Sequence, residues 1–545
     1  MSVHSLYVIS ESGSLQFYYD HSVSVTTAEK TFSYPIPLRL ASVDGRICVD
    51  FGTVDEVKPG YAVLSVNNID AGGTFLEDGR EILQIMTTYS FLTRCLRKPT
   101  AVFRTSHDAC LSHRLFCYAG LISQSSPGVF VLWPMFMRVL NKLGAIVQTK
   151  MSSLGAQMLL LPTLGDERIW TKSGRWNDAG QLFKLHDRNG KQYCLQPTHE
   201  EEITSLVGSL ELSYKDLPLR LYQISNKFRD ELRPRYGLIR CREFVMKDMY
   251  SFDKCPNSAL DTYHSVSNAY SELLSDLRLP YHKVLACAGP IGGHLSHEYH
   301  IPSSVGEDIL CICQRCGKGY NTELEDGAER IGCTDSSCPH EFQKIRGSEV
   351  GHCFLLGRRY SSCFDANYQG LDGRQTLEMG CYGLGLTRLV AVGVEYLSAA
   401  AFPDLPIEQI SEIRWPQGLA PYRGCVVLQK ETAKDAMKAE ELNSIFSILA
   451  DASYDLRFPG DILVDDRPGL SLGRKLVDIR RLGIPWIAIL KSSAGSLGPF
   501  ELIDLHRGRS HEATVHEIRS AFEQPTLFDS SALPEWDMSN RKATG

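Results

Sequence analysis

The stretch that most limits how this chain can fold is residues 223–253, QISNKFRDELRPRYGLIRCREFVMKDMYSFD. Two extended runs flank a loop that contains Pro234 and Gly237. This order predicts two antiparallel strands joined as a long hairpin.

Charged side chains gather on this hairpin. Alternation along the strands places Arg229 with Glu231 on one face of the first strand, and Arg240 with Arg242 and Phe244 on one face of the second. Guanidinium groups neutralise phosphate and carboxylate oxygens, and an aromatic ring stacks on a base. The pattern therefore suits a phosphate-bearing aromatic ligand. A solvated hairpin of mixed charge is the alternative interpretation.

Three regimes of pattern surround the hairpin. Short β segments at 5–10, 14–20, 47–52 and 61–67 fill residues 1–85, which carry eleven acids and five bases. From about 109, helices alternate with strands: helical periodicity covers 134–155 and 257–279, and 156–162 reads as a short buried strand. Beyond 420, strand–helix alternation indicates an open α/β domain of about 100 residues.

Bulk composition excludes some classes of protein. The formal charge of −7 over 545 residues shows no global basic excess, so any contact with nucleic acid must use local patches. No apolar run is long enough for a membrane span, so no membrane insertion is expected. The 17 cysteines are scattered, which favours a reducing compartment over a disulfide framework.

Four segments, in order, resemble the motifs of class II aminoacyl-tRNA synthetases in the form used by prolyl-tRNA synthetases. They are QPTHEEEIT (196–204), the hairpin 228–252, GPIGGHLSHEYH (289–300) and EMGCYGLGLTRLVA (378–391). The resemblance covers roughly 108–525 and is nearest the mitochondrial branch. It implies an α+β fold, with an antiparallel-sheet catalytic domain at 108–415, an α/β anticodon-binding domain at 421–525 and a tail at 526–545. The interval 254–377 leaves no room for the editing domain of bacterial-type prolyl enzymes.

The resemblance implies ATP-dependent ligation of L-proline to tRNA(Pro) through a prolyl-adenylate, with magnesium (Mg2+) accompanying ATP. Such chemistry depends mainly on positioning and charge neutralisation. Arg229 would bridge the proline carboxylate and the α-phosphate, and Arg240 would hold the β- and γ-phosphates. Phe244 would stack the adenine, Arg388 would cover its other side, and Glu231 would orient its amino group or the loop.

The resemblance also implies a proline pocket and a homodimer. Thr198 and Glu200 would receive the prolyl imino group, and His297 would close the pocket beside Arg229. Pro162 resembles the proline of the motif through which class II enzymes dimerise, although a simple strand terminator fits it equally. No side chain is assigned as a metal ligand. In the C-terminal domain, anticodon-stem phosphates would be met by Arg467, Arg474, Lys475, Arg480 and Arg481.

The cysteines Cys313, Cys316, Cys333 and Cys338 have spacing that could hold zinc, but the wider second pair fits a ribbon without metal equally well. His340 and Cys311 lie close by and leave the choice of ligands open. Both interpretations remain open at this point.

The two ends of the N-terminal region raise separate questions. Residues 1–85 resemble the N-terminal part of synbindin, a trafficking-complex subunit with a longin-like fold and a PDZ-like insert, which suggests a gene fusion or a mis-joined gene model. Residues 86–107 contain four basic residues and no acid, as in a mitochondrial presequence; a polar linker is the alternative. We expect a mitochondrial matrix enzyme if this segment is exposed, and a cytoplasmic one otherwise. The rival functions are a trafficking subunit with an inert synthetase-like body and a synthetase for another amino acid.

Overall fold

A computed structural model describes residues 110–523 apart from 179, 325–337, 339–340, 430–436, 438, 450–460, 468–469 and 492–496, together with the strands of residues 5–81. The chain divides into two compact units, Met1–Ile85 and Met86–Gly545, and each is considered by itself. The presequence-like segment 86–107 and the tail 526–545 lie outside the described residues.

The first unit consists of short strands. β1 (Ser5–Ile9) and β2 (Leu15–Asp20) form a two-stranded antiparallel sheet. A five-stranded antiparallel sheet follows in sequence order: β3 (Arg39–Val43), β4 (Arg46–Asp50), β5 (Tyr61–Val66), β6 (Ile69–Glu77) and β7 (Arg80–Glu81). The four β segments expected from the sequence correspond to β1, β2, β4 and β5.

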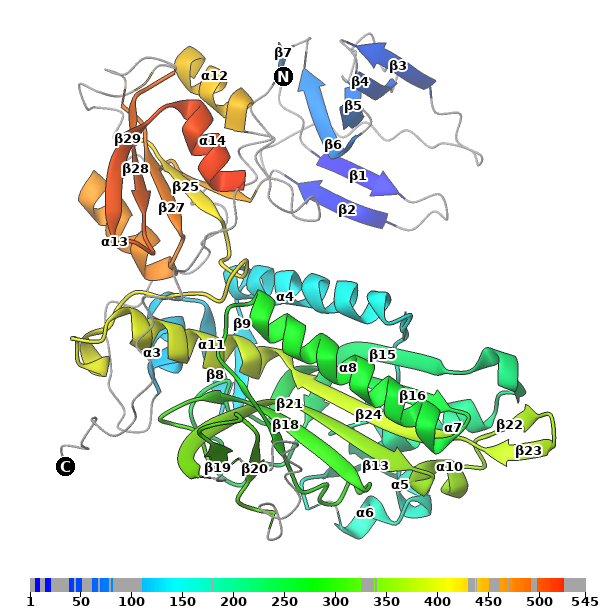
Figure 1. Cartoon of the computed structure of the whole chain (residues 1–545). Helices are drawn as coiled ribbons and strands as arrows, with labels where there is room; N and C mark the ends of the chain where they lie inside the picture. Colours follow the sequence, from blue (N-terminus) through cyan, green and yellow to red (C-terminus); the bar gives the residue numbers. More distant parts are fainter. Residues whose placement is uncertain are drawn as a thin grey trace. The chain divides into compact units, whose positions relative to one another are not determined.

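A nine-stranded sheet forms the centre of the second unit (Figure 1). Its order is β10 (Gln157–Met158), β15 (Leu219–Phe228), β16 (Glu243–Asp253), β24 (Glu378–Gly385), β21 (Phe342–Gly357), β18 (Leu295–Pro302), β17 (His282–Leu285), β20 (Gly319–Asn321) and β19 (Asp308–Cys313). All neighbours pair antiparallel except β10 with β15 and β17 with β20. The predicted antiparallel-sheet catalytic fold is confirmed.

Three helices cover one face of this sheet: α4 (Pro134–Ser153), α8 (Pro256–Asp276) and α11 (Leu386–Ala401) (Figure 1). Both predicted helices are present as α4 and α8. Proline at the first helical position begins each of them, as expected where the first N–H groups have no partner. Gly155, with φ of +69°, allows the chain to turn after α4.

Shorter elements line the opposite face. The helices are α5 (Glu167–Lys172), α6 (Arg175–Asp178), α7 (Glu200–Gly208) and α10 (Arg359–Cys363). The strands are β11 (Leu164–Asp166), β12 (Phe183–His186), β13 (Gln192–Leu195), β14 (Leu212–Ser213), β22 (Asn367–Gly370) and β23 (Gly373–Thr376). Apolar side chains of α7 and α10 pack against those of β16, β24 and β21 on this face. Preceding α4 are α3 (Leu111–Tyr118), β8 (Ile122–Ser126) and β9 (Val129–Leu132).

The expectation of a short buried strand at 156–162 is wrong. Only Gln157 and Met158 form β10, and both are exposed because this strand lies at the edge of the sheet. Leu160 is 76% exposed, whereas Leu161 is buried.

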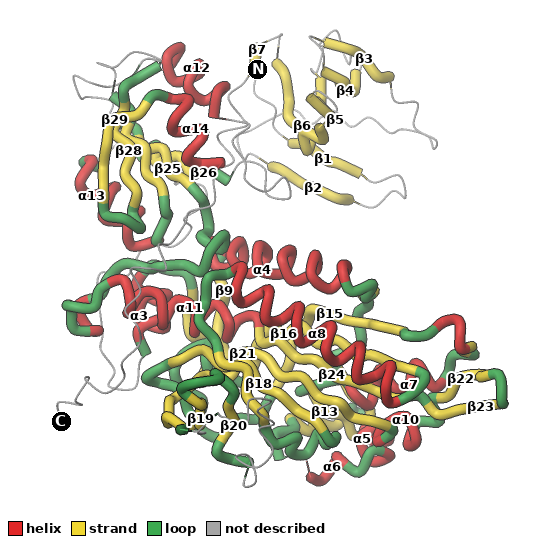
Figure 2. Tube along the Cα trace, in the orientation of Figure 1, coloured by secondary structure: helices red, strands yellow, loops and turns green. Residues whose placement is uncertain are grey.

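The C-terminal part contains a five-stranded sheet with helices (Figure 2). Its order is β26 (Ile462–Asp465), β25 (Gly424–Val427), β27 (Trp486–Ile489), β28 (Phe500–Asp504) and β29 (Arg509–Ala513). The helices are α12 (Ala439–Leu449), α13 (Leu472–Leu482) and α14 (Val515–Glu523). β25, β26 and β27 are parallel, as strand–helix alternation predicts, while β28 and β29 add an antiparallel edge.

Between β16 and β24, the described residues form α8, five strands of the catalytic sheet, α10 and the hairpin β22–β23. Among the helices that the structure describes, none combines the length and the apolarity needed to cross a bilayer.

Candidate functional site

The predicted hairpin is present, but its strands stop short of the arginines. β15 and β16 pair antiparallel from Leu219↔Phe252 to Phe228↔Glu243. Arg229, Glu231, Arg240 and Arg242 therefore lie in the connecting loop, and strand alternation does not decide where their side chains point. Only Phe244 sits on a strand. The two ends of the loop nevertheless lie side by side where the strands stop, because the Arg229 N–H donates to the Arg242 carbonyl at 2.8 Å.

Arg229 is a half-buried cation that has no counter-ion among the residues that the structure describes. Its guanidinium carbon lies 5.2 Å from the centre of the Phe244 ring. With the residues that the structure describes, its side chain forms no hydrogen bond and no ion pair. Burial, followed by the charge of Arg388, lowers the pKa of Arg229. A partly buried guanidinium of this kind is a ready site for an anion.

Arg240 is held by carboxylates instead. Its Nε donates to Glu231 Oε2 at 2.9 Å, and a second nitrogen pairs with Glu307. Glu307 also accepts from Arg235 Nε at 2.8 Å. A phosphate that bound Arg240 would have to replace Glu307, whose side chain is about one-third exposed.

Arg388 projects from the first turn of α11 toward the same region. Its Nε donates to the Ile239 carbonyl at 2.8 Å, within the loop of the hairpin. One terminal nitrogen donates to the Glu349 carbonyl at 3.1 Å and lies 3.4 Å from Glu349 Oε2. Arg388 thus joins the loop to β21 and contributes positive charge beside Arg229.

Glu298, Glu349 and His352 form a cluster that the sequence reasoning missed. Their ligand atoms all lie within 4.8 Å of one another, and His352 Nδ1 is 3.2 Å from Glu349 Oε1. Burial raises the pKa of Glu349, but His352 and Arg388 outweigh it and hold this pKa well below its usual value. Two carboxylates and an imidazole at this spacing could hold a divalent cation.

Thr198 and Glu200 lie together, as the sequence predicts. Glu200 begins α7 and is fully buried; Thr198 Oγ1 donates to its Oε1 at 2.7 Å. Arg175 approaches Oε2 at 3.0 Å, and Cys381 Sγ donates to Oε1 at 3.1 Å. A carboxylate held this firmly presents a fixed negative charge at a helix N-terminus. The charge of Glu200 also acts on Arg229.

His297 is not brought to this pocket, and its assignment there is corrected. On β18 it is opposite Cys353, which is opposite Tyr382, and this row faces the helices. His297 Nδ1 accordingly lies 2.7 Å from Tyr263 Oη on α8. Because side chains alternate along a strand, its neighbour Ser296 is the one that shares the site face, next to His352.

A buried network beneath the pocket was also missed. Lys227 Nζ, fully buried, lies 2.8 Å from both Asp248 Oδ1 and His199 Nδ1. Burial and the charge of Lys227 lower the pKa of His199 to about 4, so the imidazole is neutral: Nδ1 accepts from Lys227, and Nε2 donates to the Pro162 carbonyl at 3.0 Å. Asp248 Oδ2 accepts from Tyr250 Oη at 2.8 Å, and this hydroxyl accepts the His199 backbone N–H at 2.9 Å. By the register of β15 and β16, Lys227 and Asp248 lie on the same face of the two strands. Two opposite charges on one face of a predicted hairpin were therefore a signal in the sequence for this ion pair.

The basic residues of α13 and its approach divide into two groups. Arg467 pairs with Asp465 and Asp478, and Lys475 donates to the carbonyls of Leu428 and Asp465. Arg481 is buried and contacts Tyr118. The side chains of these three residues are occupied by contacts within the protein, so their assignment to RNA phosphates is corrected. Arg474 and Arg480 are exposed.

Comparison with known proteins agrees with this geometry. The family model described as tRNA synthetase class II core domain (G, H, P, S and T) matches residues 183–396. The probable mitochondrial proline--tRNA ligase of Rattus norvegicus is 43% identical over 394 residues, covering 72% of this chain and 80% of the relative. That of Schizosaccharomyces pombe is 37% identical over 414 residues, covering 75% and 92%.

The chain belongs to the mitochondrial type of prolyl-tRNA synthetase. Solved prolyl-tRNA synthetases share its fold. The Giardia lamblia enzyme in complex with prolyl-adenylate has a TM-score of 0.60 at 17% identity, over 76% of this chain and 79% of that one. The Cryptosporidium parvum enzyme complexed with L-proline and AMP has a TM-score of 0.58 at 14% identity, over 75% and 73%.

The family predicted from the four motifs is thereby confirmed. None of the relatives reported above supports the rival interpretation of the chain as a trafficking-complex subunit. The resemblance of residues 1–85 to synbindin stays a prediction. Cys333 and His340 lie outside the described residues.

Proposed function

We propose that this chain ligates L-proline to tRNA(Pro) with ATP, through a prolyl-adenylate, for mitochondrial translation. The observation that carries the proposal is the unpaired Arg229 guanidinium, placed beside Phe244 and Arg388 and within the field of Glu200. It is supported by the identity with mitochondrial proline--tRNA ligases.

Arg229 would bind the proline carboxylate and the α-phosphate and neutralise the charge that develops between them. Arg388 would meet the γ-phosphate, and Arg240 would reach the β- and γ-phosphates by exchanging Glu307 for them. Phe244 would stack the adenine on the ring face that Arg229 leaves open. Glu231, which holds Arg240, would orient the loop.

Thr198 and Glu200 would bind the imino group of proline. A secondary ammonium carries one positive charge and two N–H donors, which a carboxylate and a hydroxyl can accept. Arg175 would orient the Glu200 carboxylate through the contact with Oε2. The adenylate would therefore form between the two ends of the site, Glu200 and Arg229.

Magnesium would be held by Glu298, Glu349 and His352. Two carboxylates suit the preference of Mg2+ for oxygen ligands, and the lowered pKa of Glu349 keeps it ionised. The ion would supply charge neutralisation for the ATP phosphates.

We further propose that the enzyme is a homodimer built around the edge strand β10. Large apolar side chains in and just after β10 are exposed: Met158, Leu160 and Leu164. Exposed apolar side chains gathered in this way are typical of an interface. Pro162, which ends this segment, keeps its assignment to the dimerisation motif.

Leu160→Asp should shift the enzyme from dimer to monomer at micromolar concentration, because a carboxylate would be desolvated at the interface. Sedimentation velocity measures the shift. Leu371→Asp is the matched control, since Leu371 is 85% exposed in the turn between β22 and β23, which belong to a different sheet from β10. Equal dimer fractions in both variants would refute this interface.

Residues 86–107 fused to a fluorescent reporter should direct it to mitochondria, because a cationic, hydroxyl-rich segment is driven inward by the membrane potential. Microscopy reads the result, and the same segment with its four basic residues changed to glutamine is the control. A diffuse cytosolic signal from the unchanged segment would end the presequence proposal.

Glu200→Gln should raise the KM for proline roughly tenfold to a hundredfold while the KM for ATP changes little, since of the two substrates only proline would lose an ionic partner. Proline-dependent ATP–pyrophosphate exchange measures both constants. Glu202→Gln is the control: it removes a charge from the same first turn of α7 without touching Thr198 or Arg175. Equal rises in the two constants would refute this role, and exchange with another amino acid but not proline would refute the function.

A further inference from the structure

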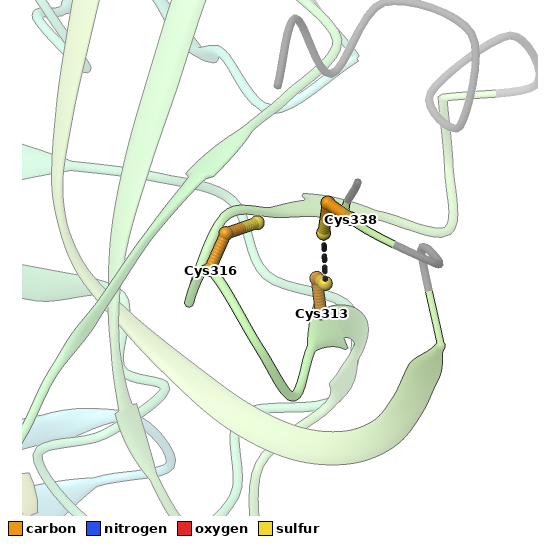
Figure 3. Close-up of side chains that lie close together, drawn as sticks. All are labelled: Cys313, Cys316 and Cys338. Carbon is orange, nitrogen blue, oxygen red and sulfur yellow. Dashed lines mark hydrogen bonds between the residues drawn. The ribbon is translucent and has the colours of Figure 1, made fainter. Parts of the chain in front are cut away.

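Three cysteine side chains converge near the start of β21. Cys313 ends β19, Cys316 lies in the turn that follows, and Cys338 comes from the segment that leads into β21 (Figure 3). Their sulfur atoms all lie within 4.8 Å of one another, and the sulfurs of Cys313 and Cys338 are 3.4 Å apart. Cys313 and Cys338 are buried, and Cys316 is half-buried. The convergence joins residues that are 25 positions apart in the sequence.

The turn that carries the first two cysteines is tightly built. The Gly317 N–H donates to the Cys313 carbonyl at 2.9 Å, and the Cys313 N–H donates to the Lys318 carbonyl at 2.8 Å. Gly317 has a φ of +69°, which a side chain would oppose. The turn therefore holds Cys313 and Cys316 close together on one side of the chain.

The spacing of the sulfurs fits a metal ion. Tetrahedral zinc with bonds of about 2.3 Å places its sulfur ligands roughly 3.8 Å apart, within the range found here. A disulfide between Cys313 and Cys338 would bring two sulfurs to about 2 Å and leave Cys316 with no role. Three thiolates are soft ligands that select zinc over magnesium or calcium.

We propose that Cys313, Cys316 and Cys338 bind one zinc ion as a structural site. The three thiols would release three protons to solvent as they bind Zn2+, and water or a further side chain would complete the four ligands. This site is separate from the one proposed for ATP and magnesium, and its chemistry does not depend on that function.

The three cysteines lie where β19 ends and β21 begins. Cys313 is opposite Phe342, the first residue of β21, so zinc would tie the end of β19 to the start of that strand. β21 then runs on to Glu349 and His352. Zinc would therefore fix the start of β21, and the middle of the same strand carries Glu349 and His352 of the proposed magnesium site.

Metal analysis of the full chain, purified with a thiol reductant and supplied zinc, should find about one zinc per chain. Cys316→Ser should lose most of this zinc, while Cys287→Ser, which removes an exposed cysteine outside the cluster, should keep it. A wild-type chain with less than about a tenth of an equivalent, or a Cys316→Ser chain with full zinc, would overturn the proposal.

Cobalt replacement tests the same site without a variant that could fail to fold. The wild-type chain loaded with Co2+ should show thiolate-to-cobalt charge-transfer absorption together with the visible bands of a tetrahedral ion. A spectrum of octahedral cobalt alone would overturn the proposal. So would a peptide that links Cys313 to Cys338 by a disulfide in the chain as isolated from cells, because the thiols would then be unable to bind metal.

Discussion

Arg229→Ala should lower the rate of proline-dependent ATP–pyrophosphate exchange by about a hundredfold or more, equivalent to about 3 kcal/mol of transition-state stabilisation. Arg229 is the unpaired cation beside Phe244, and its pKa is lowered by burial and by Arg388. Its removal would take away positive charge where, in the proposed function, the phosphate and the carboxylate meet. Because this charge matters most as the new bond forms, the loss should appear mainly in kcat.

Arg233→Ala is the matched control for this prediction. Arg233 lies in the same loop but is exposed, so its removal should leave exchange within a few-fold of the wild-type rate. Arg229→Lys should recover only part of the activity, since a single ammonium cannot replace a two-pronged guanidinium. If Arg229→Ala retained exchange at the level of Arg233→Ala, its assignment to the phosphate would be wrong.

Asp248→Asn should destabilise the catalytic domain by about 3 to 5 kcal/mol, because it leaves the buried Lys227 ammonium without its counter-ion. The side chain keeps its shape, so the loss reports charge and not volume. Two donors, Tyr250 Oη and Gln223 Nε2, also point at Asp248 Oδ2 and would face an amide. The midpoint of urea unfolding, followed by tryptophan fluorescence, measures the change.

Asp261→Asn is the control, because Asp261 is exposed on α8 and should change stability by less than about 0.5 kcal/mol. The double variant Lys227→Met with Asp248→Leu should recover much of the loss, since an apolar pair leaves no buried charge. A shift for Asp248→Asn as small as that of the control would show that Lys227 is neutral in the folded protein.

Local patterns in the sequence were sufficient for much of the fold. The hairpin, α4, α8 and the parallel part of the C-terminal sheet all follow from periodicity and turn residues close to them in the chain. The pairing of Thr198 with Glu200 is likewise local, because the two residues are only two positions apart in the sequence.

Strand ends and strand faces could not be obtained in this way. A motif match places His297 in the right segment, but which face of β18 it occupies depends on the pairing with β21. The cluster at Glu349 needs an irregularity in the same pairing: Tyr299 is opposite Gly351 and His300 is opposite Glu349, so Val350 is an extra residue. This bulge brings two residues three apart onto one side, which alternation alone forbids.

The sequence also did not show which basic residues of the C-terminal domain form ion pairs and hydrogen bonds inside the protein. Arg467, Lys475 and Arg481 look like an RNA-binding stripe in the sequence, yet Asp465, Asp478 and backbone carbonyls occupy them. Asp478 lies on α13 itself, but Asp465 belongs to β26 and Leu428 follows β25, so the amphipathic pattern of α13 alone does not reveal these partners.

The hydrogen bond from His199 to the Pro162 carbonyl has a consequence for how two subunits would work together. Leu161, next to Pro162, also donates its N–H to Gln223, which contacts Asp248. Whatever holds the segment 158–162 in place therefore also holds the base of the proposed proline site. If a second subunit does so, mass action links association to amino-acid affinity, and dilution should weaken proline binding before any subunit unfolds.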